Sequence, residues 1–451
     1  MLPSSIGHLL SMASAFRLFL AIVLIAPAFL MSDAPLAQGM LMAGVALTLF
    51  VITITLRPGE AAFFSSMIRP YGVAAALLAA VILLQLAPMP VDAWRHPIWL
   101  SAETALGGPV WGSITISPGD TVIALFRFLT FCGLLAAATA VSIDRRRAEI
   151  LLFILLAVST GLALVLAVHN SGGFIFLGEI GSTGPRAAIA LASSIATVLA
   201  LTTLVYAVER FETRHGRADF GQLGHVAALT AAIVCFVVAL ATVMMFMAKA
   251  QWLAMLMGLG TMLLIIGFRR AGVSAKFGFL IPLATLGIAV AIGLQAHGNG
   301  SPDIALRFAA DTTGPHLETA QHILSDIGWL GSGAGTFADI APLYGQASSG
   351  QVSQQAELLN APTTIAASLI GFGRPLTWAI LAGAVLSIVR LVYGALGRGR
   401  DSFFTAAAAS CLVAALVEAF IDTSLLHSAG LILVSSVFGL GVAQSTSRTA
   451  R

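Results

Sequence analysis

The sequence predicts an all-α membrane protein, a polytopic bundle of about 12 membrane-spanning helices. Only 10% of its 451 residues are charged and 58% are hydrophobic, whereas a soluble domain has about 25% charged residues. Apolar runs recur along the chain, and each is long enough to cross about 30 Å of hydrocarbon as a helix. The alternating strands of an outer-membrane barrel, about 10 residues each, are missing from the sequence. We therefore expect residues 1–451 to form a single integral membrane domain.

Twelve apolar runs give the expected spans in chain order. They cover residues 15–31, 36–56, 71–89, 119–143, 149–168, 187–208, 225–247, 252–268, 277–296, 363–391, 403–422 and 428–445. The first run has Arg17 near its start, as a secretory signal would, but further spans follow at once and the cleavage site is poor. We interpret it as an uncleaved first span.

The basic residues predict the orientation. Most of the 23 Lys and Arg residues fall on the side that carries both termini, and the positive-inside rule places that side in the cytoplasm. A net charge of +3, spread over many loops, does not indicate nucleic-acid binding. Six basic residues lie instead on or near the outer face: Arg95, Arg127, Arg186, Lys249, Arg307 and Arg374. Because membrane insertion does not explain these six, we expect some of them to bind a ligand.

Two outer segments are long enough to hold structure, Pro90 to Pro118 and residues 297–362, the second lying between spans nine and ten. Over Leu317 to Ile327, apolar residues recur at helical spacing with polar residues opposite. This pattern predicts an amphipathic helix at the membrane interface. The glycine-rich run from Gly331 to Phe337 then predicts a tight turn, because glycine adopts conformations that other residues resist.

Few reactive or ionisable side chains lie inside the apolar runs. The three cysteines behave there as small hydrophobes and predict neither a disulfide nor a metal site, and no cofactor is expected. Arg127 falls about two turns inside the fourth run, and an intramembrane charge is costly enough to imply a function and a partner. Glu418 in the eleventh run is the expected partner, and Asp422 follows one turn later on the same helix face. The three form either a structural ion-pair lock or the lining of a substrate cavity.

Four segments carry a resemblance to a known family. They are AQHILSDIGWLGSGAGTF (320–337), GSTGPRAAIA (181–190), AKAQWL (248–253) and APTTIAA (361–367). In order and in expected topology they resemble motifs of the bacterial O-antigen ligase and O-antigen polymerase superfamily, whose long periplasmic loop carries the first motif. Together with the span pattern, the resemblance covers about residues 75–445.

The resemblance implies a glycosyltransferase of the bacterial inner membrane. Such an enzyme moves a glycan from undecaprenyl diphosphate to an acceptor lipid or glycan at the periplasmic face. Arg186 and Lys249 stand at arginine positions of the family's motifs, and cations there can hold the diphosphate as it leaves, a role that a metal has elsewhere. Arg307 and Arg374 are further candidates for diphosphate binding. The competing interpretation is that these side chains only snorkel at helix ends.

The chain departs from the family at the general base. The family's periplasmic histidine, which deprotonates the acceptor hydroxyl, falls on Pro362, whose side chain accepts no proton. Imidazole titrates near neutral pH, so a histidine elsewhere can take over. His322 in the long loop and His427 after the eleventh span qualify, and His316 in the long loop is the candidate preferred here.

Three functions therefore remain open. The first is the lipid-linked glycan transferase that the resemblance implies. The second is a catalytically silent member of that superfamily that serves polysaccharide assembly as a partner, because the usual base is missing. The third is a secondary transporter with 12 spans, which would place its binding groups near the midplane of the membrane. A pocket at the outer face favours transfer, and a central path favours transport.

Overall fold

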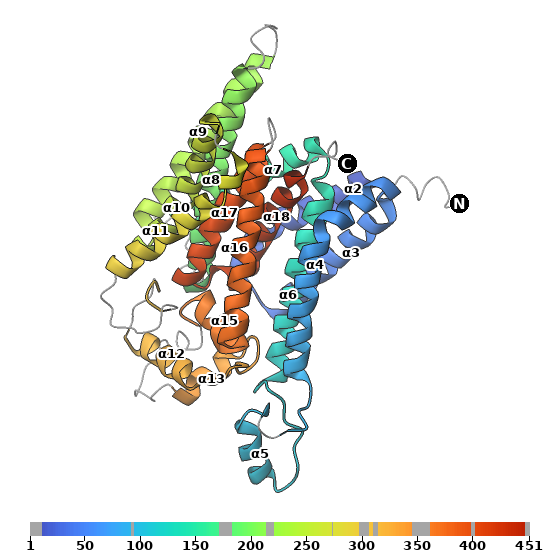
Figure 1. Cartoon of the computed structure of the whole chain (residues 1–451), viewed down its shortest axis with the longest axis vertical. Coiled ribbons are helices and arrows are strands. Elements are labelled where there is room, and N and C mark those ends of the chain that lie inside the picture. The colour runs from blue at the N-terminus through green and yellow to red at the C-terminus, as the bar shows by residue number, and fades with distance from the viewer. Residues whose placement is uncertain are drawn as a thin grey trace.

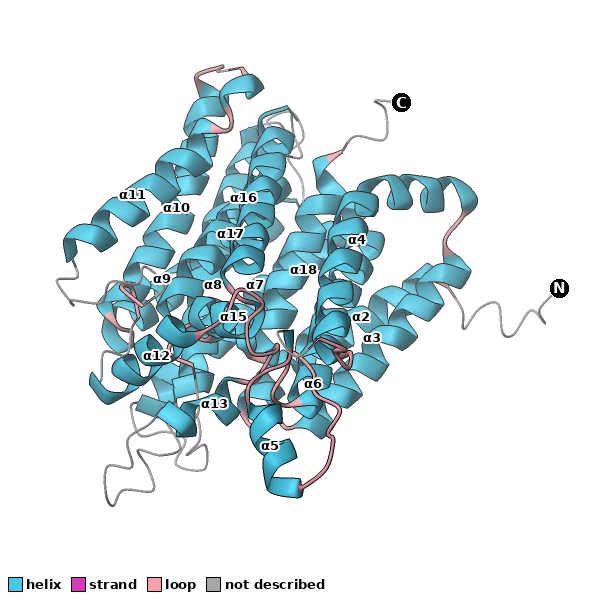
Figure 2. Cartoon of the chain, turned by 60° about the horizontal axis from the view of Figure 1, so that its bottom comes forward, coloured by secondary structure: helices cyan, strands magenta, loops and turns pink. Residues whose placement is uncertain are grey.

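A computed structural model of the chain describes residues 11–91, 94–170, 183–212, 221–272, 274–296, 306–309, 314–344, 361–397 and 402–446. These residues form helices joined by loops, and their one strand-like feature is an isolated bridge between Pro88 and Ser113 (Figure 2). Eleven of the described helical segments are long and apolar enough to cross a membrane. The prediction of an all-α polytopic membrane protein is confirmed in this form.

The helices run as follows in chain order (Figure 1). They are α2 (Met12–Ile25, continued by the 3-10 turn η1, Ala26–Leu30), α3 (Pro35–Thr55), α4 (Pro58–Leu86), α5 (Ile98–Leu106), α6 (Pro118–Val141), α7 (Arg145–Asn170), α8 (Thr183–Glu212), α9 (Gly221–Phe246), α10 (Lys249–Arg270), α11 (Leu280–Ala296), α12 (Gly314–Asp326), α13 (Phe337–Tyr344), α15 (Thr364–Phe372), α16 (Arg374–Gly397), α17 (Ser402–Ile421) and α18 (Ser428–Ser445). Short 3-10 turns lie at Ala275–Phe277 (η4) and Ser424–Leu426 (η5).

Proline sets the start of several helices. Pro35, Pro58 and Pro118 each occupy the first turn of their helix, where the missing N–H has no helical partner to lose and the fixed φ suits the helix. The chain thus turns sharply between α3 and α4, and Arg57 lies at that turn. The helix starts are readable from the sequence for this reason.

The centre of the bundle is built from α8, α17 and α18. More than four fifths of the span residues of these three helices are buried, whereas only 11% are buried in α4, which presents its apolar side chains outward. Small residues allow the central helices to approach closely, because glycine leaves room for a neighbouring backbone. A Cβ added at Gly439 of α18 would overlap Ala138 of α6, and one at Gly441 would overlap Ala408 of α17.

The two ends of the bundle differ. α2 begins and α18 ends at one of them, which we call the termini end. The other carries α5, α12, α13 and α15 (Figure 1), and we call it the loop end. α12, α13 and α15 pack together there through a small apolar cluster that includes Ile323, Ile340 and Ile370. The expected amphipathic helix therefore exists as α12, but its buried face contacts protein, where the sequence predicted a membrane interface.

Three expected spans differ from the structure. The third, expected over 71–89, is part of α4, which already begins at Pro58 and continues through Pro70. The ninth corresponds to α11, which has 17 residues and is shorter than the eleven candidate spans. The tenth, expected over 363–391, is broken at Gly373, whose φ of 78° belongs to the region that favours glycine. Its membrane-spanning part is α16, and α15 belongs to the layer at the loop end (Figure 1).

The glycine-rich run and this break hold each other in place. The N–H of Ser332 donates to Ile370 O at 2.9 Å, and the N–H of Gly333 donates to Gly371 O at 3.2 Å. The backbones approach so closely that a Cβ at Gly373 would overlap the Trp329 carbonyl. Gln85 of α4 seals the junction, since its Nε2 donates to both Leu330 O at 3.0 Å and Gly371 O at 2.9 Å. The predicted turn at Gly331–Phe337 is confirmed, and its glycines serve tight packing.

Candidate functional site at the loop end

Two of the predicted cations meet at the turn between α9 and α10. Arg186 lies in the first turn of α8, and its Nη2 donates to the carbonyl of Phe246, the last residue of α9, at 2.6 Å. Lys249 begins α10 three residues later and is exposed. The Arg186 guanidinium therefore reaches the turn that ends at Lys249. Both side chains are exposed, so their charges are accessible to a ligand at this end of the bundle.

Asp422 and Glu418 form a buried carboxyl pair just beneath this turn. Asp422 Oδ2 accepts from Nε2 of Gln251, on the first turn of α10, at 2.9 Å, and its Oδ1 accepts from the N–H of Ser424 at 2.8 Å. No donor among the described residues reaches either oxygen of Glu418, which is fully buried. Glu418 and Asp422 are thus buried acids one turn apart at the end of α17, and of the two only Asp422 accepts hydrogen bonds through its side chain in the described part of the chain.

Asp422 is buried, and its hydrogen-bond donors offset part of the effect of burial on its carboxyl group. Burial raises the pKa of the Asp422 carboxyl above its ordinary value of 3.8, and the hydrogen bonds from Gln251 and Ser424 offset part of that rise. Its backbone carbonyl also accepts from the N–H of Thr364 at 2.8 Å, which ties the start of α15 to the end of α17. Asp422 thus links the helix bundle to the layer at the loop end.

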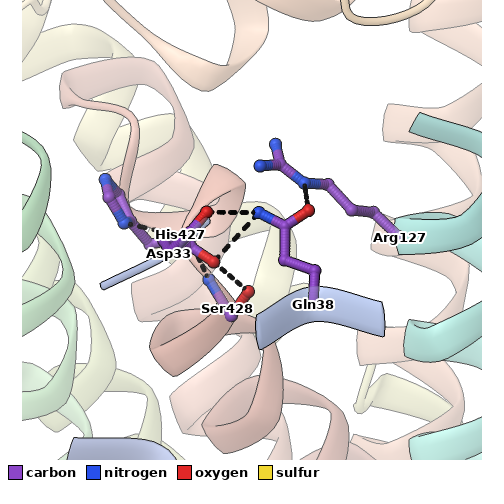
Figure 3. A network of polar contacts seen from close by, with 5 residues as sticks. All are labelled: Asp33, Gln38, Arg127, His427 and Ser428. Atoms are coloured by element: carbon purple, nitrogen blue, oxygen red, sulfur yellow. Dashed lines mark hydrogen bonds and ion pairs between the residues drawn. The ribbon is translucent and has the colours of Figure 1, made fainter. Parts of the chain in front are cut away.

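Arg127 has a different partner from the one expected. Its Nε donates to Gln38 Oε1 at 2.8 Å, and Figure 3 shows Gln38 bridging Arg127 to Asp33. Gln38 lies in the first turn of α3, so the long side chain of Arg127 carries its charge toward the loop end. The predicted contact with Glu418 is wrong: Arg127 contacts α3, and α6 and α17, which carry the two residues, each pack against α18.

Asp33 is the centre of this network, in the turn between η1 and α3. Its Oδ1 accepts from Ser428 Oγ at 2.6 Å and from Gln38 Nε2 at 3.0 Å, and its Oδ2 accepts from the Ser428 N–H at 3.0 Å. Burial raises the pKa of the Asp33 carboxyl, but the hydrogen bonds from His427, Ser428 and Gln38 outweigh it. The pKa therefore lies below its ordinary value of 3.8, and Asp33 is a fixed negative charge.

His427 lies between Asp33 and the start of α8. Its Nδ1 is 3.3 Å from Asp33 Oδ2, which is within ion-pair distance when the imidazole is protonated. Nε2 points at the N-terminal turn of α8, since a Cβ added at Gly184 would overlap it. Gly184 precedes Arg186 by two residues. An imidazole and an exposed guanidinium therefore lie at one helix start.

The remaining predicted residues have separate positions. Arg307 follows Leu306 in a segment that Phe308 anchors against Ala254 of α10 and Ile421 of α17, so its backbone lies near the outer ends of these helices. Nη2 of Arg374 donates to Leu324 O at 3.3 Å. This contact places a cation at the C-terminus of α12, which the helix dipole favours. Arg374 therefore has a structural contact with α12, and its binding of diphosphate stays a prediction.

Two loop residues and one outer cation complete the set. His316 lies in the first turn of α12, and its side chain is outside the described residues. Pro362 is buried directly before Thr363, the N-cap of α15. Arg95, the sixth outer cation, pairs with Glu103 at 2.6 Å and donates to Val110 O at 2.6 Å. It holds the α5 segment together, which is a structural explanation for an outer charge.

Sequence reasoning missed three residues of this site: Asp33, Gln38 and Gln251. All three lie in a turn or in the first turn of a helix at the loop end. The signal was the rarity of polar side chains next to such apolar runs, but their partners are distant in sequence. The chain matches no protein-family model, and no curated protein is significantly similar to it.

Proposed function

We propose that the chain is a membrane glycosyltransferase that moves a glycan from a polyprenyl diphosphate carrier to an acceptor hydroxyl at the loop end. The observation that carries this proposal is the position of the His427–Asp33 pair at the start of α8, two residues from Arg186. A base and a cation are the two groups that such a transfer needs most. The motif resemblance supports the same reaction class.

The cations serve the leaving group. When the acceptor oxygen bonds to the anomeric carbon, the bond from that carbon to the diphosphate breaks and its electron pair stays on the diphosphate. Both Arg186 and Lys249 are exposed, and the Arg186 guanidinium reaches the α9–α10 turn that ends at Lys249. They bind the diphosphate and stabilise the negative charge that it gains. Both residues begin helices, so they lie at the depth of a lipid head group.

His427 serves the acceptor. Its Nε2 takes the proton of the acceptor hydroxyl as that oxygen attacks, and Asp33 stabilises the resulting imidazolium through Nδ1. This assignment replaces both the family's histidine position, which is Pro362 here, and the sequence-based candidate His316. Asp422 is less suited to be the base, because it is buried and Gln251 and Ser424 already donate to its oxygens.

The positions of the charges support transfer over transport. A secondary carrier needs binding groups near the midplane of the membrane. Here Arg127 is drawn to the first turn of α3, and Asp422 lies beyond the last residue of α17. The charges of the site thus gather at one end of the bundle.

The proposal is tested in the native cell by surface-glycan analysis. His427→Asn, Arg186→Ala and Lys249→Ala are each compared with His322→Asn, a matched control on the exposed face of α12. We expect glycan attachment or elongation to fall about 100-fold or more in the His427 variant, which is the usual contribution of a general base, and to remain normal in the control. Protein levels are measured by immunoblotting.

Two other results would reject the proposal or assign the chain a role without catalysis. Normal glycan in the His427, Arg186 and Lys249 variants, at normal protein level, would reject the proposal. If removal of the whole protein still altered the glycan in that case, the chain would act as a partner in polysaccharide assembly without catalysis of its own.

A further inference from the structure

The termini end contains a large polar cavity that the proposed reaction does not use. Its volume is about 690 Å³, within the range of about 300–1,000 Å³ that ligand sites occupy. It is an open cavity where the ends of six helices meet, α2, α3, α4, α6, α7 and α18. Three arginines line it, Arg57, Arg145 and Arg147, together with Glu60 and Asp144.

The charged side chains of the cavity differ in their partners. Asp144 Oδ1 accepts from the N–H of Arg146 at 2.8 Å, so this carboxylate caps the start of α7. Arg145 pairs with Glu149 on its own helix at 3.2 Å. Within the part of the chain that the structure describes, no carboxylate lies within ion-pair distance of Arg57 or Arg147. These two cations, from α4 and α7, line the cavity without a direct ion-pair partner in that part of the chain.

The depth and the walls of the cavity indicate what it binds. Thr55 is the last residue of α3, Arg57 directly precedes α4 and Arg147 lies in the first turn of α7. All three positions are at the level where a helix leaves hydrocarbon for head groups. Next to the charges the walls are apolar, with Met12, Phe63 and Ile143 among them, and α4 presents most of its surface outward. A ligand with a phosphate and an adjacent apolar part matches these walls.

We propose that this cavity binds the phosphate ester of an anionic phospholipid head group, with Arg57 and Arg147 as its principal ligands. One arginine can donate two parallel hydrogen bonds to two oxygens of a phosphate. Basic pockets between helices on the cytoplasmic side of membranes bind phosphate-containing head groups. A soluble phosphate ester offers the same chemistry without the acyl chains. The site lies at the opposite end of the bundle from His427 and Arg186, so it does not depend on the proposed reaction.

The experiment measures lipid binding to the full chain, purified in neutral detergent, by thermal unfolding and native mass spectrometry. Phosphatidylglycerol is titrated beside phosphatidylcholine with the same acyl chains, and beside glycerol 3-phosphate. Arg57→Gln, Arg147→Gln and the double variant are compared with Arg146→Gln, which removes a neighbouring cation that does not line the cavity. We expect each cavity variant to weaken phosphatidylglycerol binding about fivefold and the double variant about 25-fold.

The outcomes separate the ligand sources. Binding of glycerol 3-phosphate that equals that of the lipid and needs the same arginines would keep the site but assign it to a soluble phosphate ester. Equal binding of phosphatidylcholine, or wild-type affinity in the double variant, would overturn the proposal. If the double variant does not fold, Thr55→Glu, which adds a negative charge to the cavity wall and keeps every arginine, is expected to weaken phosphatidylglycerol binding in the same way.

Discussion

The two ends of the bundle differ in whether their charged side chains have partners within the protein. At the loop end, Asp33 has partners in Gln38, His427 and Ser428, and Gln38 in turn holds Arg127 (Figure 3). At the termini end, the arginines around the large cavity include two without a carboxylate partner in the described chain. Groups that the protein itself satisfies are held in a defined orientation, as a catalytic arrangement requires. Groups that it leaves unsatisfied are available for an external ligand.

The close backbone packing at Gly373 is a further feature of the loop end. Its disruption should give the largest loss of stability. Gly373→Ala forces a side chain into a conformation with φ 78° and ψ 167°, and its Cβ overlaps the Trp329 carbonyl. We expect the free energy of unfolding to fall by about 3 kcal/mol or more, from backbone strain and steric overlap together. Unfolding of the purified variant in detergent measures this loss.

Gly383→Ala is the matched control, because a Cβ at Gly383 of α16 meets nothing within 4 Å. It should be neutral or slightly stabilising, since alanine favours helix over glycine by up to about 1 kcal/mol. Equal stability in the two variants would show that the junction between the glycine-rich run and α15 does not hold the loop end together.

Loss of the Asp33 carboxylate should give the next largest effect. Asp33→Ala leaves the Ser428 N–H and hydroxyl without their acceptor and removes the carboxylate beside Gln38 and His427. We expect the free energy of unfolding to fall by about 2–3 kcal/mol, since buried donors lose their partner. Arg57→Ala at the termini end should change it by about 0.5 kcal/mol or less in the absence of anionic lipid. A similar loss in both variants would break the contrast between the ends.

The smallest expected effect is a difference in the pH dependence of stability between the wild type and Asp33→Asn, and its direction follows from the pKa of Asp33. Because the folded-state pKa of Asp33 lies below 3.8, its stabilisation is complete above that value and is lost as the pH falls through the folded-state pKa. The stability advantage of the wild type over Asp33→Asn should therefore shrink by about 1 kcal/mol between pH 5 and pH 3. Thermal unfolding of both proteins over this range checks it, and a constant difference contradicts the assignment of Asp33 as the charged member of the network.

The site was predictable only in part. Arg186 and Lys249 were chosen as outer cations and motif positions, and the structure places the Arg186 guanidinium at the turn that ends at Lys249. The partner of Arg127 was not predictable, because 89 residues separate it from Gln38. His427 shared its sequence features with His316 and His322, and only the nearby Asp33, distant in the chain, distinguishes it.

The sequence by itself determined that this is a helical membrane protein, because apolar runs longer than the hydrocarbon thickness have no stable alternative to helices there. It also determined the helix starts at proline and the turn at the glycine-rich run, which depend on local backbone sterics. Only the tertiary structure decided which polar groups meet, where the tenth run breaks and which face of α12 is covered. Those outcomes depend on contacts between segments that are distant in the chain, and local composition carries no record of them.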